Sequence, residues 1–238
     1  MRSTALTLAA LSACVVLGAC AAGAQDARPT VRIAEAVKPS PARALDKILP
    51  THQELAVVLG SAGMMGQFVE GGPDVLLASV GKTDATPADC VSPTYRLQRV
   101  VYEAGPVQSV ASQSWAGGSF DGPPVSGFFG VVKFATTEDA QAFFAASADK
   151  WHRCNGQTLV LNQPGNGAQG TSRITDVTVD GRMVSAMVMH DSGSMTQRAL
   201  GVAADCVVDV EVTDINGLGG PDGASTVASL MLEKVGTS

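Results

Sequence analysis

Cys206-Val207-Val208-Asp209-Val210-Glu211-Val212 is the clearest strand signal in this chain of 238 residues. Its even-numbered residues are apolar and alternate with residues that are mostly polar, which is typical of a strand that buries one face. Two similar runs precede it, at 182–190 and 195–203. The turn signals Asp191-Ser192-Gly193 and Ala204-Asp205 separate the three runs, so the sequence predicts an antiparallel meander.

A long helix is predicted upstream of this meander. Thr136 and Asp139 offer its start, and a stripe with helical spacing follows, formed by Ala140, Phe143, Phe144, Ser147, Trp151 and Cys154. The capping-box pattern Thr51-His52-Gln53-Glu54 predicts a second helix that ends at Gly60. Further strands are expected at 107–115, 128–134, 158–161 and 174–179, and a last helix at 224–235. We therefore expect an α+β fold with an antiparallel sheet and helices packed on one face.

Composition excludes two classes of protein. Apolar residues make up 45% of the chain and charged residues 16%, a balance that a disordered protein does not have. The formal net charge is −6, and no run of Lys or Arg occurs. Since affinity for a phosphate backbone comes from clustered cations, we expect no nucleic-acid partner.

The N-terminus has the features of a targeting segment. A charged start is followed by an apolar stretch at 5–17 that is too short to span a membrane, and then by Leu17-Gly18-Ala19-Cys20. This resembles the bacterial lipoprotein signature, which implies cleavage before Cys20 and lipidation of its thiol. We therefore expect a signal peptide at 1–19, a lipid-anchored tether at 20–43, and a folded domain at 44–238 outside the cytoplasm. The alternative is an ordinary cleaved leader with a chance cysteine.

Three further cysteines lie in the folded part, and an oxidising compartment allows one disulfide among them. Cys206 falls on the apolar face of its strand, where a thiol behaves as a small hydrophobe. Cys90 follows a polar loop, and Cys154 ends the long helix. Spacing favours Cys90 with Cys154 only slightly, and the other two pairings stay open.

Several segments resemble the PknH-like extracellular domain, which occurs as the sensor domain of a mycobacterial serine/threonine kinase and in stand-alone mycobacterial lipoproteins. The similarity spans about residues 49–235 and rests on Pro87-Ala88-Asp89-Cys90, on 142–148 with Trp151 and Cys154, on Thr196-Gln197-Arg198-Ala199-Leu200 and on 207–210. The resemblance implies an α+β domain with a twisted antiparallel sheet and a cleft for a ligand. The resemblance also implies two disulfides, and the second would fall at Thr196 and Thr213, where this chain has no cysteine. It therefore implies that Cys90–Cys154 is the bridge retained here and that Cys206 is not part of it.

Motifs for cofactors and metals fail on their context. Gly165–Gly170 matches the letters of a dinucleotide fingerprint but lacks the preceding strand and following helix. The run that starts at Asp214 lacks the oxygens of a calcium loop, and His52, His152 and His190 have no zinc spacing. Met183, Met187 and Met189, with Met195 opposite, are expected to fill core gaps, and the alternative is an adaptable apolar binding surface.

The sequence therefore predicts a lipid-anchored envelope protein without catalytic machinery, cofactor or metal. The resemblance implies that its sensor-like domain binds a small molecule, a lipid or another envelope component. No residue of that ligand site can be named from the sequence. The alternatives are an interaction module for another envelope protein and, third, an envelope hydrolase in which His190 or His52 would act.

Overall fold

The structure is a computed structural model that describes residues 44–118, 125–162, 169–214 and 222–237. The predicted signal peptide, Cys20 and the tether at 20–43 lie outside the described residues. Most of the glycine-rich loop at 165–170 and of the run that starts at Asp214 also lies outside them.

The described residues form one nine-stranded sheet in the order β1-β3-β4-β9-β8-β7-β6-β5-β2, and every neighbouring pair is antiparallel. Its five consecutive strands β5 to β9 lie side by side, which confirms the predicted meander. The strands are β1 (Gly63–Gly71), β2 (Ala85–Thr86), β3 (Val107–Gly117), β4 (Val125–Phe134), β5 (Thr158–Asn162), β6 (Gln169–Asp180), β7 (Met183–His190), β8 (Met195–Ala203) and β9 (Cys206–Asp214).

The two helices with capping signals in the sequence begin where those signals predict. Thr51 completes the capping box of the first helix, because its hydroxyl accepts from the Glu54 amide and Glu54 accepts from the Thr51 amide. Thr136 caps the long helix through the Asp139 amide. None of the described helices is long and apolar enough to cross a membrane. The α-helices are α1 (His52–Val58), α2 (Val91–Thr94), α3 (Arg99–Tyr102), α4 (Thr137–Cys154) and α5 (Gly223–Thr237), and the 3-10 turns are η1 (Leu45–Lys47), η2 (Pro73–Val75) and η3 (Ala88–Cys90).

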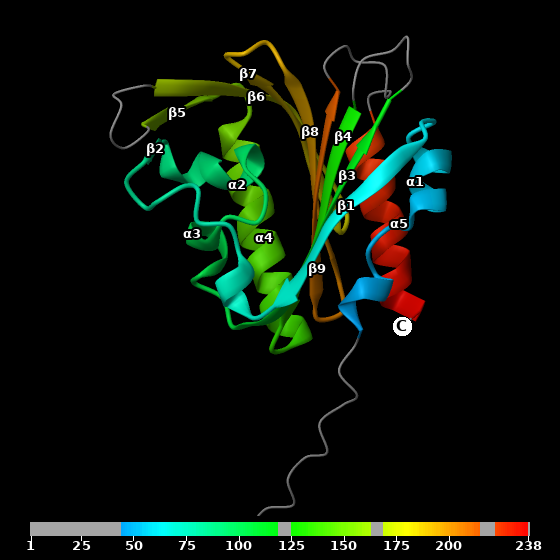
Figure 1. The fold of residues 1–238 in the computed structure, drawn as a ribbon. Coiled ribbons are helices and arrows are strands. Elements are labelled where there is room, and N and C mark those ends of the chain that lie inside the picture. The colour runs from blue at the N-terminus through cyan, green and yellow to red at the C-terminus, as the bar shows by residue number, and fades with distance from the viewer. Residues whose placement is uncertain (1–43, 119–124, 163–168, 215–221, 238) are drawn as a thin grey trace, which may run out of the picture. The chain divides into compact units, whose positions relative to one another are not determined.

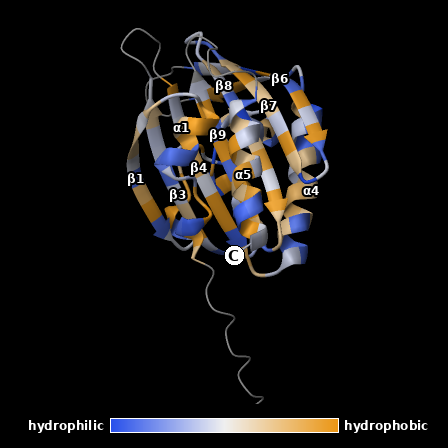
Figure 2. Cartoon of the chain, turned by 90° about the vertical axis from the view of Figure 1, so that its right-hand side faces the viewer, coloured by the Kyte–Doolittle hydropathy of each residue, from blue (hydrophilic) through white to orange (hydrophobic). Residues whose placement is uncertain are grey.

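The helices pack on both faces of the twisted sheet, which corrects the expectation of one face. Figure 1 shows α2, α3 and α4 on one side of the sheet and α1 and α5 on the other. Figure 2 looks onto the α5 side. Two apolar cores result: Val207 and Leu200 belong to the α4 core, and their chain neighbours Val208 and Ala199 belong to the α5 core. Central strands that carry apolar residues on both faces bury both faces under helices. The polar residues within 206–212 indicated instead that one face of this strand is exposed to solvent.

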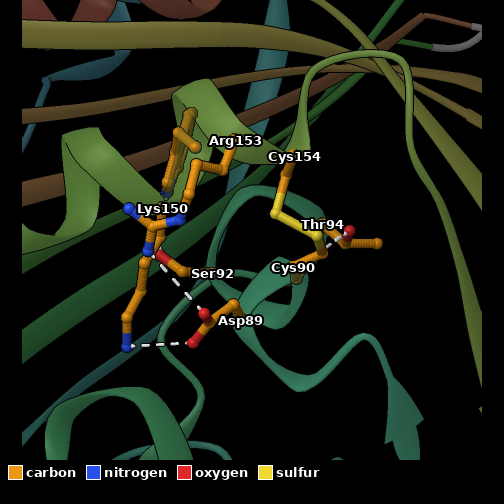
Figure 3. The surroundings of a disulfide bond; sticks show 8 residues. Asp89, Cys90, Ser92, Thr94, Lys150, Arg153 and Cys154 are labelled. Carbon is orange, nitrogen blue, oxygen red and sulfur yellow. Dashed lines mark hydrogen bonds and ion pairs between the residues drawn. A yellow bond between two sulfur atoms is a disulfide. The ribbon is translucent and has the colours of Figure 1, made fainter.

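The disulfide fixes one end of α4 to the segment that leads into α2. Cys90 and Cys154 are joined, with Cα atoms 5.6 Å apart, so the predicted pairing is present (Figure 3). Asp89 adds ion pairs of 3.4 Å to Lys150 and 3.7 Å to Arg153. Cys206 lies outside the bridge and is buried in the α5 core.

Candidate functional site

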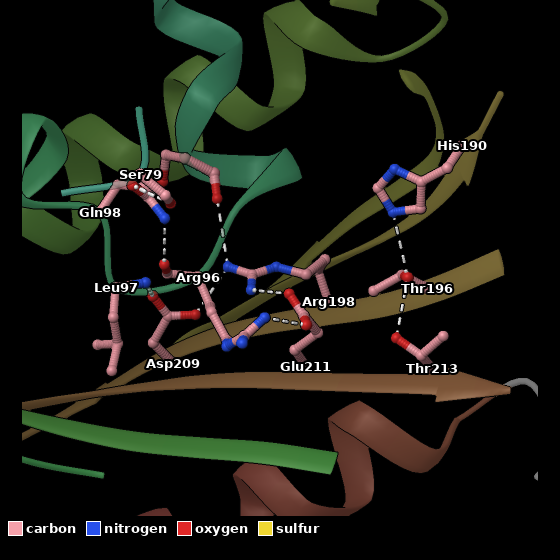
Figure 4. A network of polar contacts seen from close by, with 11 residues as sticks. Ser79, Arg96, Leu97, Gln98, His190, Thr196, Arg198, Asp209, Glu211 and Thr213 are labelled. Carbon is pink, nitrogen blue, oxygen red and sulfur yellow. Dashed lines mark hydrogen bonds and ion pairs between the residues drawn. The ribbon is translucent and has the colours of Figure 1, made fainter. Parts of the chain in front are cut away.

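Polar side chains form a row on the α4 face of the sheet, where an apolar core would be expected (Figure 4). Strands β7, β8 and β9 and the segment between α2 and α3 contribute to it. We call it the polar row, and its members are Arg96, His190, Thr196, Arg198, Asp209, Glu211 and Thr213.

The inner end of the polar row is a buried ion pair. Arg198 Nη2 lies 2.7 Å from Asp209 Oδ1, and the two side chains are 0% and 3% exposed. Asp209 Oδ2 also accepts from the Leu97 amide at 2.8 Å and from the Tyr102 hydroxyl at 2.9 Å. Burial, followed by the charge of Asp209 and the hydrogen bond to it, raises the pKa of Tyr102 well above its ordinary value. This end of the row is closed to solvent and holds α2 and α3 against the sheet.

The middle of the row is a carboxylate between two guanidinium groups. Glu211 forms ion pairs with Arg96 and with Arg198, the latter at 3.3 Å. Arg96 lies over the ring of Phe128 at 4.0 Å from its centroid, and its side chain is 32% exposed. Among the described residues, the Nε atoms of Arg96 and Arg198 have no hydrogen-bond partner. The row therefore passes from buried to solvent-accessible at Arg96 and Glu211.

The outer end of the row is a chain of hydroxyls around His190. Its Nδ1 lies 2.9 Å from the hydroxyl of Ser172, and its Nε2 lies 3.2 Å from that of Thr196. Thr196 Oγ1 in turn lies 3.1 Å from Thr213 Oγ1. Burial lowers the pKa of His190 despite the opposing charges of Glu211 and Asp191. A neutral imidazole between two hydroxyls donates one hydrogen bond and accepts the other.

An apolar hollow lies on the same face, between α3 and α4. Its volume is about 360 Å³, and Val100, Val101 and Phe143 are among its lining residues. Ser92 lies between the hollow and the polar row: its carbonyl accepts from Arg198 at 3.3 Å, and its hydroxyl accepts from Trp151 at 2.9 Å. The α4 face therefore offers both charged and apolar surface to a bound molecule.

The histidines that the sequence analysis weighed lie on separate elements. His52 begins α1, His152 lies near the end of α4, and both are exposed. The described residues contain no group of three or more His, Cys, Asp or Glu that could hold a metal ion.

Sequence reasoning missed the polar row itself. Asp209 and Glu211 read as the solvent face of a strand, and Arg198 lies within an otherwise uncharged strand. The available signal was this lone arginine directly before the apolar half of β8, because a buried arginine needs a carboxylate partner.

The methionines do not fill core gaps as a group, and that expectation is wrong for two of them. Met189 is 49% exposed and Met195 is 40% exposed. Met183 does pack against the α5 core, and Met187 is half-buried.

The sequence of this chain is similar to that of a known family of extracellular domains. Residues 40–234 match the model of the PknH-like extracellular domain family. The chain is 29% identical over 175 residues to the serine/threonine-protein kinase PknH of Mycobacterium bovis and to that of Mycobacterium tuberculosis. Those alignments cover 70% of this chain but only 27% and 26% of the kinases.

The fold agrees with a solved structure of the same family. The extracellular domain of PknH from Mycobacterium tuberculosis superposes with a TM-score of 0.66 at 23% identity, over 81% of this chain and 95% of that domain. This likeness confirms the α+β fold with its antiparallel sheet. Because the family model covers most of the chain, the protein belongs to the PknH-like extracellular domain family.

Proposed function

We propose that this protein is a lipid-anchored, non-catalytic binding domain that acts outside the cytoplasm as a sensor-like module. Its ligand is a small polar molecule or a polar group of an envelope component, and it contacts the accessible part of the polar row. The chain spans about a quarter of the kinases that it matches, so kinase partnership is no part of the proposal.

One observation carries the binding proposal: a buried ion-pair network opens to solvent at one end. Arg198 and Asp209 fix the inner end, while Arg96, Glu211 and His190 are only partly buried. Buried partners hold such groups in place before a ligand arrives, and preorganisation reduces the cost of binding. Arg96 supplies a cation and Glu211 an anion, and both suit a ligand that offers hydrogen-bond donors and acceptors.

The arrangement around His190 supports a non-catalytic role. A hydrolase needs a nucleophile that a substrate can reach. Ser172 and Thr196, the two hydroxyls beside the imidazole, are 2% and 3% exposed. The Asp191 carboxylate accepts from the Thr171 amide at 3.0 Å, and among the described residues it forms no hydrogen bond with the ring. Neither hydroxyl that is hydrogen-bonded to the imidazole is therefore open to a substrate, and the exposed Ser192 on the neighbouring turn bonds to Ser194.

The binding proposal is tested by thermal-shift screening of the purified full chain against polar metabolites and envelope headgroups. We expect at least one compound to raise the melting temperature, because a ligand at 100 times its Kd contributes about 2.7 kcal/mol. The Glu211→Gln variant should lose most of this shift, whereas Lys82→Gln, on an exposed part of the surface, should retain it. A shift that is equal in both variants would place the ligand elsewhere, and an absence of any shift would contradict the proposal.

The anchor is tested by phase partitioning after expression in a bacterium that processes lipoproteins. Wild-type protein should enter the detergent phase, and Cys20→Ala should leave it, because two or more acyl chains give stable membrane binding. Equal partitioning of both proteins into the aqueous phase would overturn this part of the proposal.

The edge of the sheet favours the second candidate function, an interaction module for another envelope protein. Strand β1 is the last strand on its side, and its residues Met64 and Phe68 are 78% and 42% exposed. Exposed edge strands can pair with a strand of a partner. Crosslinking that recovers one protein through β1, together with no ligand shift, would favour this function.

A further inference from the structure

The α5 face of the sheet carries a group of methionines that the proposed function does not use. Met187 and Met189 are two residues apart on β7, so their side chains leave the same face. Met195 on β8 is the register partner of Met189 and shares that face. Side chains that are directly opposite have Cβ atoms roughly 4.5–5.5 Å apart, and diagonal ones roughly 7–8 Å, so the three thioethers can converge. We call these three residues the thioether patch.

The thioether patch is open to solvent and borders a groove. Met189 and Met195 are 49% and 40% exposed because α5 packs on β8 and β9 and leaves this end of β7 uncovered. Met187 and Met195 line a groove of about 340 Å³ beside the start of α5. Core side chains of this protein are buried, so core packing does not account for Met189 and Met195 at these positions.

The charges around the patch suit a cation. Asp176 and Asp222 line the same groove, together with the hydroxyl-bearing Thr178 and Ser185. Arg198 also borders it, but its guanidinium lies on the opposite face, where it is paired with Asp209 and Glu211. Arg173, the register partner of Met189, is exposed, and its long side chain can carry its charge into solvent.

We propose that the thioether patch is a site for a soft monovalent cation, Cu(I) or its close analogue Ag(I). Thioether sulfur is a soft, neutral ligand that selects Cu(I) over the hard cations, which prefer oxygen. Three sulfur ligands from two adjacent strands give a trigonal set, and the two carboxylates of the groove balance the positive charge. The site lies on the other face of the sheet from the polar row and is independent of it.

A thioether site has a property that thiol and imidazole sites lack. Cysteine and histidine must lose a proton before they bind a metal, so their affinity falls as the pH falls. Methionine has no proton to lose. Affinity at the thioether patch should therefore be the same at about pH 5.5 and about pH 7.5, which distinguishes it from binding at Cys206 or at the three histidines.

The test titrates silver nitrate into the full chain in chloride-free buffer, with methionine methyl groups labelled with ¹³C for NMR. We expect one Ag(I) per chain by native mass spectrometry. The methyl signals of Met187, Met189 and Met195 should shift, and those of Met64 and the buried Met231 should not. The Met189→Leu/Met195→Leu variant keeps side-chain volume and should bind at least about tenfold more weakly, with Met195→Leu alone as a milder variant.

The control is Met64→Leu, which removes an exposed methionine outside the patch and should bind Ag(I) as the wild type does. Circular dichroism and the melting temperature establish that each variant is folded. Unchanged methyl signals, equal affinity in the double variant, or an affinity that falls with pH would each overturn the proposal. None of these outcomes bears on ligand binding at the polar row.

Discussion

Thr196 and Thr213 face each other across strands β8 and β9, with their hydroxyl oxygens 3.1 Å apart. The family resemblance places a second disulfide at these two positions, and the register shows that side chains there are in direct contact. In this chain the two positions are linked by a hydrogen bond, and Thr196 is also a polar neighbour of His190.

The first prediction restores this bridge. Cα atoms of directly opposite residues lie roughly 4.5–5.5 Å apart, within the range that a disulfide spans. The Thr196→Cys/Thr213→Cys variant should therefore oxidise to a bridge between residues 17 apart in sequence and gain about 3 kcal/mol in the free energy of unfolding. Peptide mapping and denaturant unfolding check this. Reduction should remove the gain, and mispairing with Cys206 would contradict the expected geometry.

The second prediction concerns the native bridge. Cys90 and Cys154 are 64 residues apart in sequence, so their link restricts a large part of the unfolded chain. Cys154→Ser should lower the free energy of unfolding by about 2–5 kcal/mol, measured by urea unfolding. A reductant should bring the wild type toward the variant and leave the variant itself unchanged. If the two proteins unfold at the same urea concentration, the bridge contributes little.

The third prediction concerns the buried ion pair of the polar row. Asp209→Asn leaves the Arg198 guanidinium buried without its main carboxylate partner, which should cost about 3–5 kcal/mol. Glu103→Gln breaks the exposed pair with Lys82 and should cost about 0–1 kcal/mol. Equal losses in the two variants, measured by denaturant unfolding, would show that the inner end of the row does not depend on charge.

The fourth prediction concerns pH. Burial lowers the pKa of His190 below its ordinary value of 6.5, with the charge of Arg198 acting in the same direction and those of Glu211 and Asp191 opposing it. Between the folded pKa and 6.5 the unfolded chain binds more protons than the folded one, so stability falls as the pH falls through this window. His190→Gln should reduce that fall.

The measurement is the free energy of unfolding of both proteins at a series of pH values from about 7.5 to 5. The difference between wild type and variant isolates His190 from other groups that titrate in this range. A difference that stays constant over the series, or that grows in the opposite direction, would contradict a depressed pKa.

The regular elements of this fold could be predicted because their signals are local. The alternation at 206–212, the stripe of the long helix and the capping box at Thr51 each depend on a few neighbouring residues, and each led to the right element. Strand β1 was missed because Gly63, Gly66 and Gly71 interrupt its pattern. Gly63 is needed for space, because a Cβ there would meet the Trp115 ring at 2.3 Å.

The candidate site could not be predicted because its partners are far apart in the sequence. Arg96 meets Glu211 across 115 residues, and the Leu97 amide meets Asp209 across 112. An acidic residue that alternates with valines has the same sequence pattern whether water or an arginine covers it. Helices α2 and α3 and the segment between them lie over the sheet and convert that polar face into a buried network.

The two ends of the described domain meet on the α5 face. Lys234, near the end of α5, donates to the Leu49 carbonyl at 2.9 Å and forms an ion pair with Glu54 at 2.6 Å. Leu45, Ile48 and Leu49 are buried in the same core as α5. Because the ends lie this close, a short linker could join them and new ends could be opened at the Asp191–Gly193 turn. Such a circular permutant would keep every strand pair of the sheet while reversing which half of the domain leaves the ribosome first.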